Sequence, residues 1–168
     1  DFLGVDTAWV RSIPPDSWRT SGPDRVFVDR WGVPWRRAAG SPYYEIDRSP
    51  LEGLDPSEVL AARWELITDD MVKDMQRQVP CLRRRGDRAL FSDVVGAGIF
   101  ERAWYLRGFQ NLLTDMMTEK AFVHQLFENI LEAQLQAYAK LLDGVGGDLE
   151  GVLITDDLAT QDGLLMSR

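Results

Sequence analysis

The pattern of apolar and polar positions is clearest in the second half of the chain. A short apolar run at residues 89–95 is followed by glycines, and a second run at 151–155 ends on Asp156 and Asp157. Short continuous apolar runs that end in turn residues are typical of buried strands. The pattern therefore predicts two buried strands, each of which ends at a glycine-rich or polar loop.

Two helices are predicted between these strands. The first covers residues 99–117, and the second begins after Thr118, which is expected to cap it. Apolar side chains recur at helical spacing from Phe122 to Leu142, and this helix is expected to stop at Gly144. A strand, helices and a second strand predict parallel strands joined by a right-handed crossover. An α/β barrel and a doubly wound sheet both fit this pattern.

The first half of the chain is expected to be loop-rich and aromatic. All eight prolines lie at or before Pro80, and four of the six tryptophans lie within the first 35 residues. Alternating residues over 25–37, interrupted by turn residues, predict a β-hairpin. Helices are predicted to start at Asp55 and near Thr68, and Pro80 is expected to end or kink the second one.

Composition and charge restrict the class of protein. The 168 residues include 19 Lys and Arg against 27 Asp and Glu, a net charge of −8, which argues against a nucleic-acid partner. No apolar run approaches the roughly 18 residues of a membrane span, so no membrane partner is expected. The single cysteine, Cys81, excludes an internal disulfide, so a cytoplasmic protein is expected. With His124 as the single histidine, a Cys/His zinc site cannot be completed within this chain.

Candidate chemistry lies where the two predicted strands end, because parallel α/β folds bind ligands at that edge. Asp156 and Asp157 are adjacent carboxylates that can bind a cation, accept hydrogen bonds from substrate, or act as acid and base. The alternative is that one of them caps the next helix and the other is solvated. Asp93 follows the first strand and needs a partner or solvent. Glu101 and Arg102 open a helix at the same edge, where a surface ion pair is the alternative.

Several strings, in this order and spacing, resemble the uroporphyrinogen decarboxylase superfamily. They lie at residues 3–6, 29–33, 43–45, 98–108 and 155–163. They are similar to the decarboxylase-like and methyltransferase-like branch rather than to the haem-pathway enzymes. The resemblance implies an α/β fold that is part of a TIM-type (β/α)8 barrel of roughly 250 residues or more, after a loop-rich N-terminal segment that contains the hairpin. Residues 1–168 are then expected to be a partial domain, incomplete at both ends.

The resemblance also implies roles for individual residues. A strand-end tyrosine of the haem-pathway enzymes falls at Trp104, and one of their serines falls at Asp157. Catalytic groups are expected at Asp156, Asp157 and Glu101. Substrate contacts are expected at Arg102, Trp104, Arg107 and Gln161.

Two reactions fit the resemblance. In decarboxylation, strand-end acids hold the pyrrole N–H groups of a tetrapyrrole in a water-poor cleft. In methyl transfer, the same acids orient a corrinoid-linked substrate, and the loss of the family's Tyr and Ser favours this reaction. No cofactor is expected within this chain, whereas zinc and a corrinoid are expected in the full-length protein. A corrinoid protein and a second copy of the chain are the expected partners. The alternative is a non-catalytic barrel paralogue that binds a ligand or a partner subunit.

Overall fold

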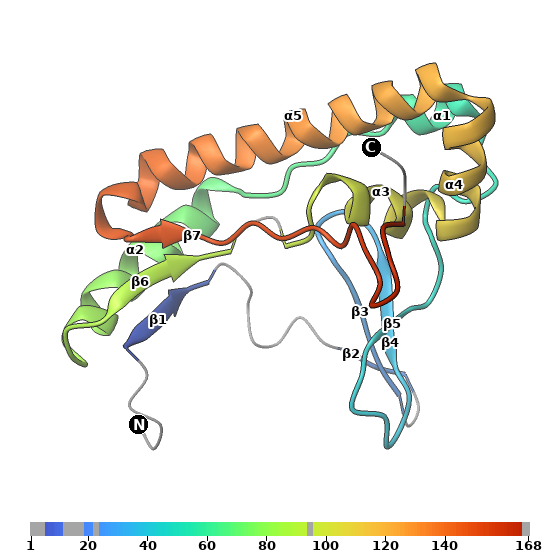
Figure 1. The fold of residues 1–168 in the computed structure, drawn as a ribbon. Helices are drawn as coiled ribbons and strands as arrows, with labels where there is room; N and C mark the ends of the chain where they lie inside the picture. Colours follow the sequence, from blue (N-terminus) through green and yellow to red (C-terminus); the bar gives the residue numbers. More distant parts are fainter. Residues whose placement is uncertain (1–5, 12–18, 22–23, 94–95, 166–168) are drawn as a thin grey trace.

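The computed structural model describes residues 6–11, 19–21, 24–93 and 96–165, which form two sheets and a group of helices (Figure 1). The parallel sheet has the strand order β1-β6-β7, with β1 at Thr7–Val10, β6 at Ala89–Ser92 and β7 at Gly151–Val152. Its register pairs Trp9 with Phe91, and Phe91 with Gly151. The expectation of two parallel strands in the second half is confirmed, and β1 adds a third strand beside β6.

Both of these strands are shorter than predicted. β6 ends at Ser92, and residues 94–95 of the predicted run lie outside the described residues. β7 ends at Val152, and Leu153 and Ile154 are 42% and 63% exposed rather than buried. Among the described strands β7 pairs with β6 alone, so no strand covers the far side of this segment. A parallel bridge between Ala97 and Thr155 carries the pairing on toward the loops.

The predicted helix over 99–117 is two helices, α3 (Ile99–Arg107) and α4 (Phe109–Thr118). They are separated at Gly108, whose φ of +89° is a left-handed conformation that glycine adopts without steric cost. The long helix α5 (Lys120–Val145) follows at once. Thr118 does not cap it: Glu119 holds the cap position, and the Thr118 hydroxyl donates to the carbonyl of Thr114 inside α4.

The first half contains an antiparallel sheet in the order β2-β3-β4-β5. The strands are β2 (Arg19–Ser21), β3 (Asp24–Val28), β4 (Pro34–Arg37) and β5 (Glu45–Ile46). The predicted hairpin is confirmed, because β3 pairs with β4 from Arg25 opposite Arg37 to Val28 opposite Pro34. The turn between them places Asp29 within hydrogen-bond distance of Arg102 in α3.

Two helices connect the sheets, as the cap residues predict. α1 (Pro56–Ala61) begins at Asp55, which forms a capping box with Glu58, and α2 (Asp69–Arg83) begins at Thr68. Pro80 does not end α2, which continues to Arg83. Proline has no N–H to bond the carbonyl four residues earlier, so α2 loses one backbone hydrogen bond there and still continues for three residues.

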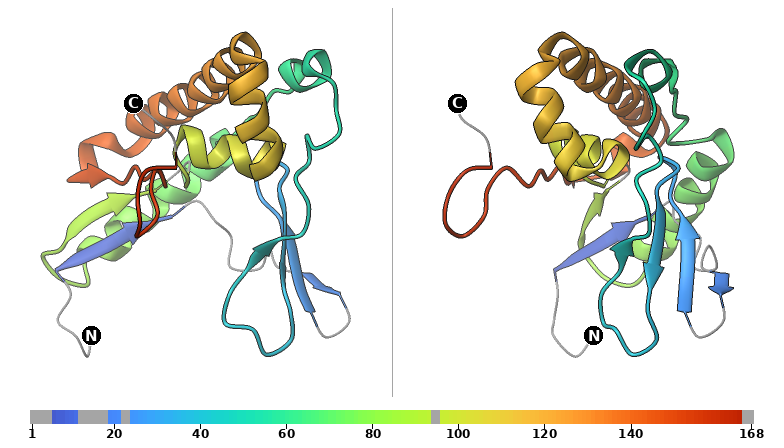
Figure 2. Two further views of the ribbon diagram at one scale, coloured as in Figure 1. Left: turned by 45° about the vertical axis from the view of Figure 1, so that its right-hand side comes forward. Right: turned by 90° about the vertical axis from the view of Figure 1, so that its right-hand side faces the viewer.

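The core is built around α5, which contacts α1, α2, α3 and α4. Its buried side chains include Leu126, Ile130 and Leu141, each fully shielded from solvent. Figures 1 and 2 show α5 running along the parallel sheet, while the antiparallel sheet extends away from α3 and α4. The fold is mixed α/β with an open parallel sheet. The three described parallel strands form an open sheet, and the expectation that they are part of a TIM-type barrel stays a prediction.

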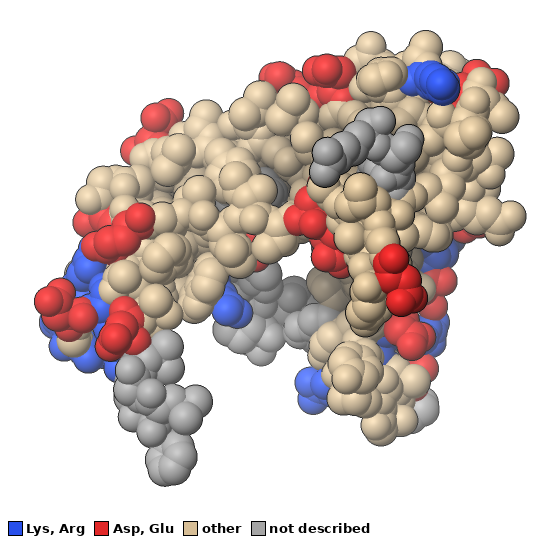
Figure 3. Space-filling model, in the orientation of Figure 1, with Lys and Arg blue, Asp and Glu red and all other residues tan. Residues whose placement is uncertain are grey.

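The surface over α5 and β7 carries few charges (Figure 3). The exposed large apolar side chains of these segments are Leu135 and Leu142 in α5 and Leu153 and Ile154 directly after β7. Within the described ranges, no helix is both long and apolar enough to cross a membrane.

Candidate functional site

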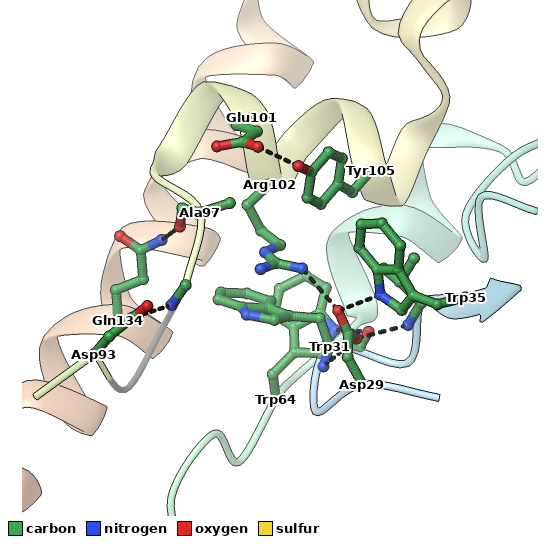
Figure 4. A network of polar contacts seen from close by, with 12 residues as sticks. Asp29, Trp31, Trp35, Trp64, Asp93, Ala97, Glu101, Arg102, Tyr105 and Gln134 are labelled. Carbon is green, nitrogen blue, oxygen red and sulfur yellow. Dashed lines mark hydrogen bonds and ion pairs between the residues drawn. The ribbon is translucent and has the colours of Figure 1, made fainter. Parts of the chain in front are cut away.

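The carboxyl ends of β6 and β7 meet the amino end of α3, and polar side chains gather there (Figure 4). Ser92 at the end of β6 is fully buried, and its hydroxyl donates to the carbonyl of Val10 in β1 at 2.9 Å. This bond ties two strand ends together. The carboxyl ends of β1 and β6 are therefore held together at the edge of the sheet where parallel α/β folds bind ligands.

Asp156 anchors the amino end of α3 from outside the helix. Its carboxylate accepts hydrogen bonds from the backbone N–H of Phe100 at 2.9 Å and of Glu101 at 2.8 Å. Gly98 holds the cap position and has no side chain for this purpose, and a Cβ there would lie 2.4 Å from the Asp156 side chain. A carboxylate at a helix amino end is favourable because the unpaired N–H groups and the helix dipole both attract it. The capping alternative therefore describes Asp156, although the helix it caps precedes it in the chain.

Glu101 and Tyr105 form a pair one turn apart on α3. The Tyr105 hydroxyl donates a hydrogen bond to Oε1 of Glu101. Burial raises the pKa of Glu101, and the charges of Asp157 and Asp156 raise it further, while the bond from Tyr105 opposes the rise. Burial also raises the pKa of Tyr105, as does its bond to the carboxylate. The pair is thus a half-buried carboxyl group whose proton affinity is increased by its surroundings.

Arg102 lies behind this pair and is almost fully buried, with 6% of its side chain exposed. Its Nη1 lies 3.0 Å from Oδ2 of Asp29, and its guanidinium lies about 5 Å from the ring centres of Trp31 and Tyr105. Burial lowers the pKa of Arg102, and Asp29 opposes this. The expected surface ion pair between Glu101 and Arg102 is not what holds Arg102, because its partner is Asp29 on the hairpin turn.

Asp29 is the centre of this turn, and sequence reasoning did not single it out as a site residue. Its carboxylate accepts bonds from the backbone N–H groups of Trp31 and Val33, both at 2.9 Å, and from the indole N–H of Trp35 at 3.1 Å. With Arg102 this makes four donors on one carboxylate. The string at 29–33 that carries the family resemblance contains Asp29, Trp31 and Val33, and it was the available signal for this part of the site. Tyr105 was missed in the same way, inside the string at 98–108.

Asp93 lies on the β6 side of the same edge. Its carboxylate accepts a bond from the backbone N–H of Gly96 at 2.9 Å. Burial raises the pKa of Tyr138 to about 12, and the charge of Asp93 contributes. Arg30 is also near, because Asp93 is among the charges that raise its pKa against the larger lowering by burial. Asp93 thus has a hydrogen-bond partner of its own within the loop that leads to α3.

The other expected site residues lie elsewhere or at the rim. Asp157 and Gln161 are exposed on the segment after β7. Trp104 lines a surface pocket that does not include the cluster residues, although its ring packs against that of Tyr105. Arg107 lies at the opposite end of α3, where its Nε pairs with Asp115 at 2.8 Å and its Nη1 donates to the carbonyls of Leu51 and Leu54. The structure therefore brings Asp156, Asp157, Glu101 and Arg102 together and separates Arg107 from them.

A zinc site does not fit the described residues. No group of three or more His, Cys, Asp or Glu side chains in the described ranges is arranged to hold a metal ion. Cys81 is exposed on α2 and His124 is exposed on α5. The strand-end carboxylates have other partners, since Asp156 binds backbone N–H groups and Glu101 binds Tyr105.

Comparisons with known proteins give one informative result. No protein-family model matches the chain. No curated protein matches its sequence. Among solved structures, a methyltransferase from Methanosarcina mazei matches with a TM-score of 0.57 and 12% sequence identity. The match covers 81% of this chain and 39% of that structure, so the chain spans about two fifths of its neighbour's length. At this identity the likeness shows that the chain shares its mixed α/β fold with a methyltransferase.

Proposed function

We propose that this chain acts in methyl transfer, as part of an enzyme of the uroporphyrinogen decarboxylase superfamily. The observation that carries the proposal is the half-buried Glu101–Tyr105 pair beside Arg102, at the carboxyl edge of a parallel sheet. The fold likeness to a methyltransferase and the sequence strings at 29–33, 98–108 and 155–163 support it. The proposed substrates are a corrinoid-linked or tetrapyrrole compound and a methyl acceptor that carries a proton on its reacting atom.

Glu101 is the proposed proton acceptor. A carboxylate with a raised pKa takes a proton more readily than an ordinary one near neutral pH. Tyr105 donates its hydrogen bond to Oε1 of Glu101, so Oε2 is the atom proposed to take the proton from the methyl acceptor. The electron pair left on the acceptor atom then forms the bond to the methyl carbon. The methyl donor departs with the electron pair of the broken bond.

The remaining residues of the cluster position this pair. Arg102 favours the charged form of Glu101, so the carboxylate is available as a base. Asp156 holds the first turn of α3 and thereby Glu101 itself. Asp157 and Gln161, exposed at the rim, are proposed to bind polar groups of the substrate, and they suit the amide side chains around a corrin ring.

A corrinoid would supply an electrophilic methyl group when bound, and no step is assigned to zinc because the described residues do not form its site. Decarboxylation gains no support from the structural neighbour, which is a methyltransferase. Methyl transfer is therefore the reaction that we put forward.

The test is a methyl-transfer assay with methylcobalamin and 2-mercaptoethanol as probes, followed by the absorbance change on demethylation. The chain is expected to accelerate demethylation above the protein-free rate. Glu101→Gln is expected to lower the rate by about 100-fold, the scale of a positioned acid–base group. Glu65→Gln, an exposed carboxylate outside the cluster, is the matched control and is expected to leave the rate unchanged.

Two outcomes would contradict the proposal. A rate equal to the protein-free rate would reject methyl transfer, and saturable binding of methylcobalamin without turnover would favour the non-catalytic paralogue. Full activity in Glu101→Gln would reject Glu101 as the base.

A further inference from the structure

A surface pocket lies between the segment after β5 and the junction of α3 and α4, and it does not include the residues of the strand-end cluster. Its volume is about 390 Å³, within the range of small-molecule sites. Trp104 contributes to its wall, while the next residue, Tyr105, belongs to the strand-end cluster. The ring of Trp104 packs edge-on against that of Tyr105, with ring centres 4.2 Å apart, so the pocket adjoins the cluster, although Glu101, Arg102 and Tyr105 do not line it.

The apolar part of the pocket is an aromatic corner. The rings of Trp104 and Phe109 are 5.7 Å apart and meet at 86°, so they form two walls nearly at right angles. Phe109 is 41% exposed although it is a large apolar side chain, and Ile46 adds an aliphatic surface. Such a corner can accept the side of a flat or aliphatic group that would otherwise face water.

The charged part of the pocket is lined by Asp47, Arg48 and Glu52. Asp47 is neutralised by Arg36, whose Nε lies 2.6 Å from its carboxylate and lowers its pKa, and the charge of Arg48 contributes to the lowered pKa. Arg48 and Glu52, by contrast, make no side-chain hydrogen bond or ion pair with any residue in the described ranges. They lie on either side of a turn in which the backbone N–H of Glu52 donates to the carbonyl of Ser49. Among the described residues, the pocket therefore presents a cation and an anion, neither of them held by a side-chain hydrogen bond or ion pair, next to an apolar corner.

We infer that this pocket binds a small zwitterion with an apolar side group, of the kind that a free aromatic or aliphatic amino acid represents. Its carboxylate pairs with Arg48, its ammonium group pairs with Glu52, and its side group lies against Trp104 and Phe109. This site is independent of the proposed methyl transfer, because none of these four residues takes part in the proton transfer or the binding steps described above.

The test uses three probes that differ in charge. L-phenylalanine carries both charges, 3-phenylpropionate lacks the ammonium group, and phenethylamine lacks the carboxylate. Binding is followed by the NMR shift of the Trp104 indole N–H, assigned with Trp104→Phe. We expect L-phenylalanine to bind with a dissociation constant on the order of 1 mM, as suits so small a ligand.

Two variants separate the two charges. Arg48→Gln is expected to weaken the binding of L-phenylalanine and of 3-phenylpropionate by about tenfold or more and to leave the binding of phenethylamine unchanged. Glu52→Gln is expected to weaken the binding of L-phenylalanine and of phenethylamine to the same extent and to leave the binding of 3-phenylpropionate unchanged. Arg85→Gln and Glu65→Gln, exposed residues away from the pocket, are the matched controls and should bind as the parent chain does.

Three results would overturn the inference. The first is the absence of a saturable indole shift with L-phenylalanine up to about ten times the expected dissociation constant. The second is equal binding of L-phenylalanine by the parent chain and both variants. The third is loss of binding of all three probes in either variant. Because both substituted side chains are exposed, circular dichroism of each variant provides the check that the fold is intact.

Discussion

Helix α3 buries an arginine near each of its ends, and the surroundings of the two differ. Arg107 pairs with Asp115 and donates to two backbone carbonyls, so its partners belong to the scaffold of the fold. Arg102 pairs with Asp29 and lies between two aromatic rings, directly behind the Glu101–Tyr105 pair. A buried arginine is therefore not by itself a sign of a ligand site. What distinguishes Arg102 is its neighbouring carboxyl group with a raised pKa at the sheet edge.

The largest effect is expected at the scaffold end of α3. Arg107→Met should lower the free energy of unfolding by about 3–5 kcal/mol, because it leaves the buried carboxylate of Asp115 without its cation. Urea denaturation measures this, with Arg85→Met as the exposed control. A loss below about 1 kcal/mol, the scale of an exposed ion pair, would contradict the scaffold role.

The next effect is expected at the rim of the site. Asp157→Ala should lower methyl-transfer turnover by about 10- to 100-fold, the scale of a lost hydrogen bond from substrate to a charged group. Thermal unfolding should stay unchanged, because Asp157 is exposed and supports no described backbone bond. Asp156→Ala is the matched contrast, and it should cost about 1 kcal/mol of stability because the first turn of α3 loses its acceptor. Near-normal turnover in Asp157→Ala would remove Asp157 from the site.

A smaller loss of stability is expected from Arg102→Met than from Arg107→Met. Asp29 keeps three other donors when Arg102 is removed, so the cost should be about 1–3 kcal/mol. The same variant should raise the pKa of Glu101 further, since the charge of Arg102 lowers it. The pH at which methyl-transfer activity reaches half its maximum should then move upward. An unchanged pH profile would show that Arg102 belongs with Arg107 as a scaffold residue.

The smallest effect is the pH dependence of stability at Glu101. Burial raises the pKa of this group above its ordinary value of 4.5, so the folded state binds the proton more tightly than the unfolded chain does. Stability is therefore lost as pH rises from 4.5 through the raised pKa, and the loss is complete above it. Glu101→Gln should be more stable than the parent at neutral pH and equal to it below pH 4, where both are uncharged. A constant difference across this range would contradict the raised pKa.

Local sequence patterns sufficed for much of the fold. The hairpin over 25–37 and the helix starts at Asp55 and Thr68 are confirmed, because alternation and caps act over a few neighbouring residues. The two parallel strands are also confirmed, but both are shorter than the apolar runs predict. The break at Gly108 was not predicted, because a glycine inside a helical pattern is usually tolerated, and the left-handed conformation that divides α3 from α4 is visible only in the backbone.

The candidate site also combines features that the sequence predicts with features that only the tertiary structure decides. The sequence by itself determined that Asp156, Asp157 and Glu101 lie at strand and helix ends, since position along the chain decides that. The tertiary structure alone decided that Asp156 caps α3 across 55 residues, that Asp29 meets Arg102 across 73, and that Arg107 binds the carbonyls of Leu51 and Leu54. Each of these bonds joins segments far apart in the chain, and a buried charge takes whichever partner the packing brings near, which no local pattern encodes.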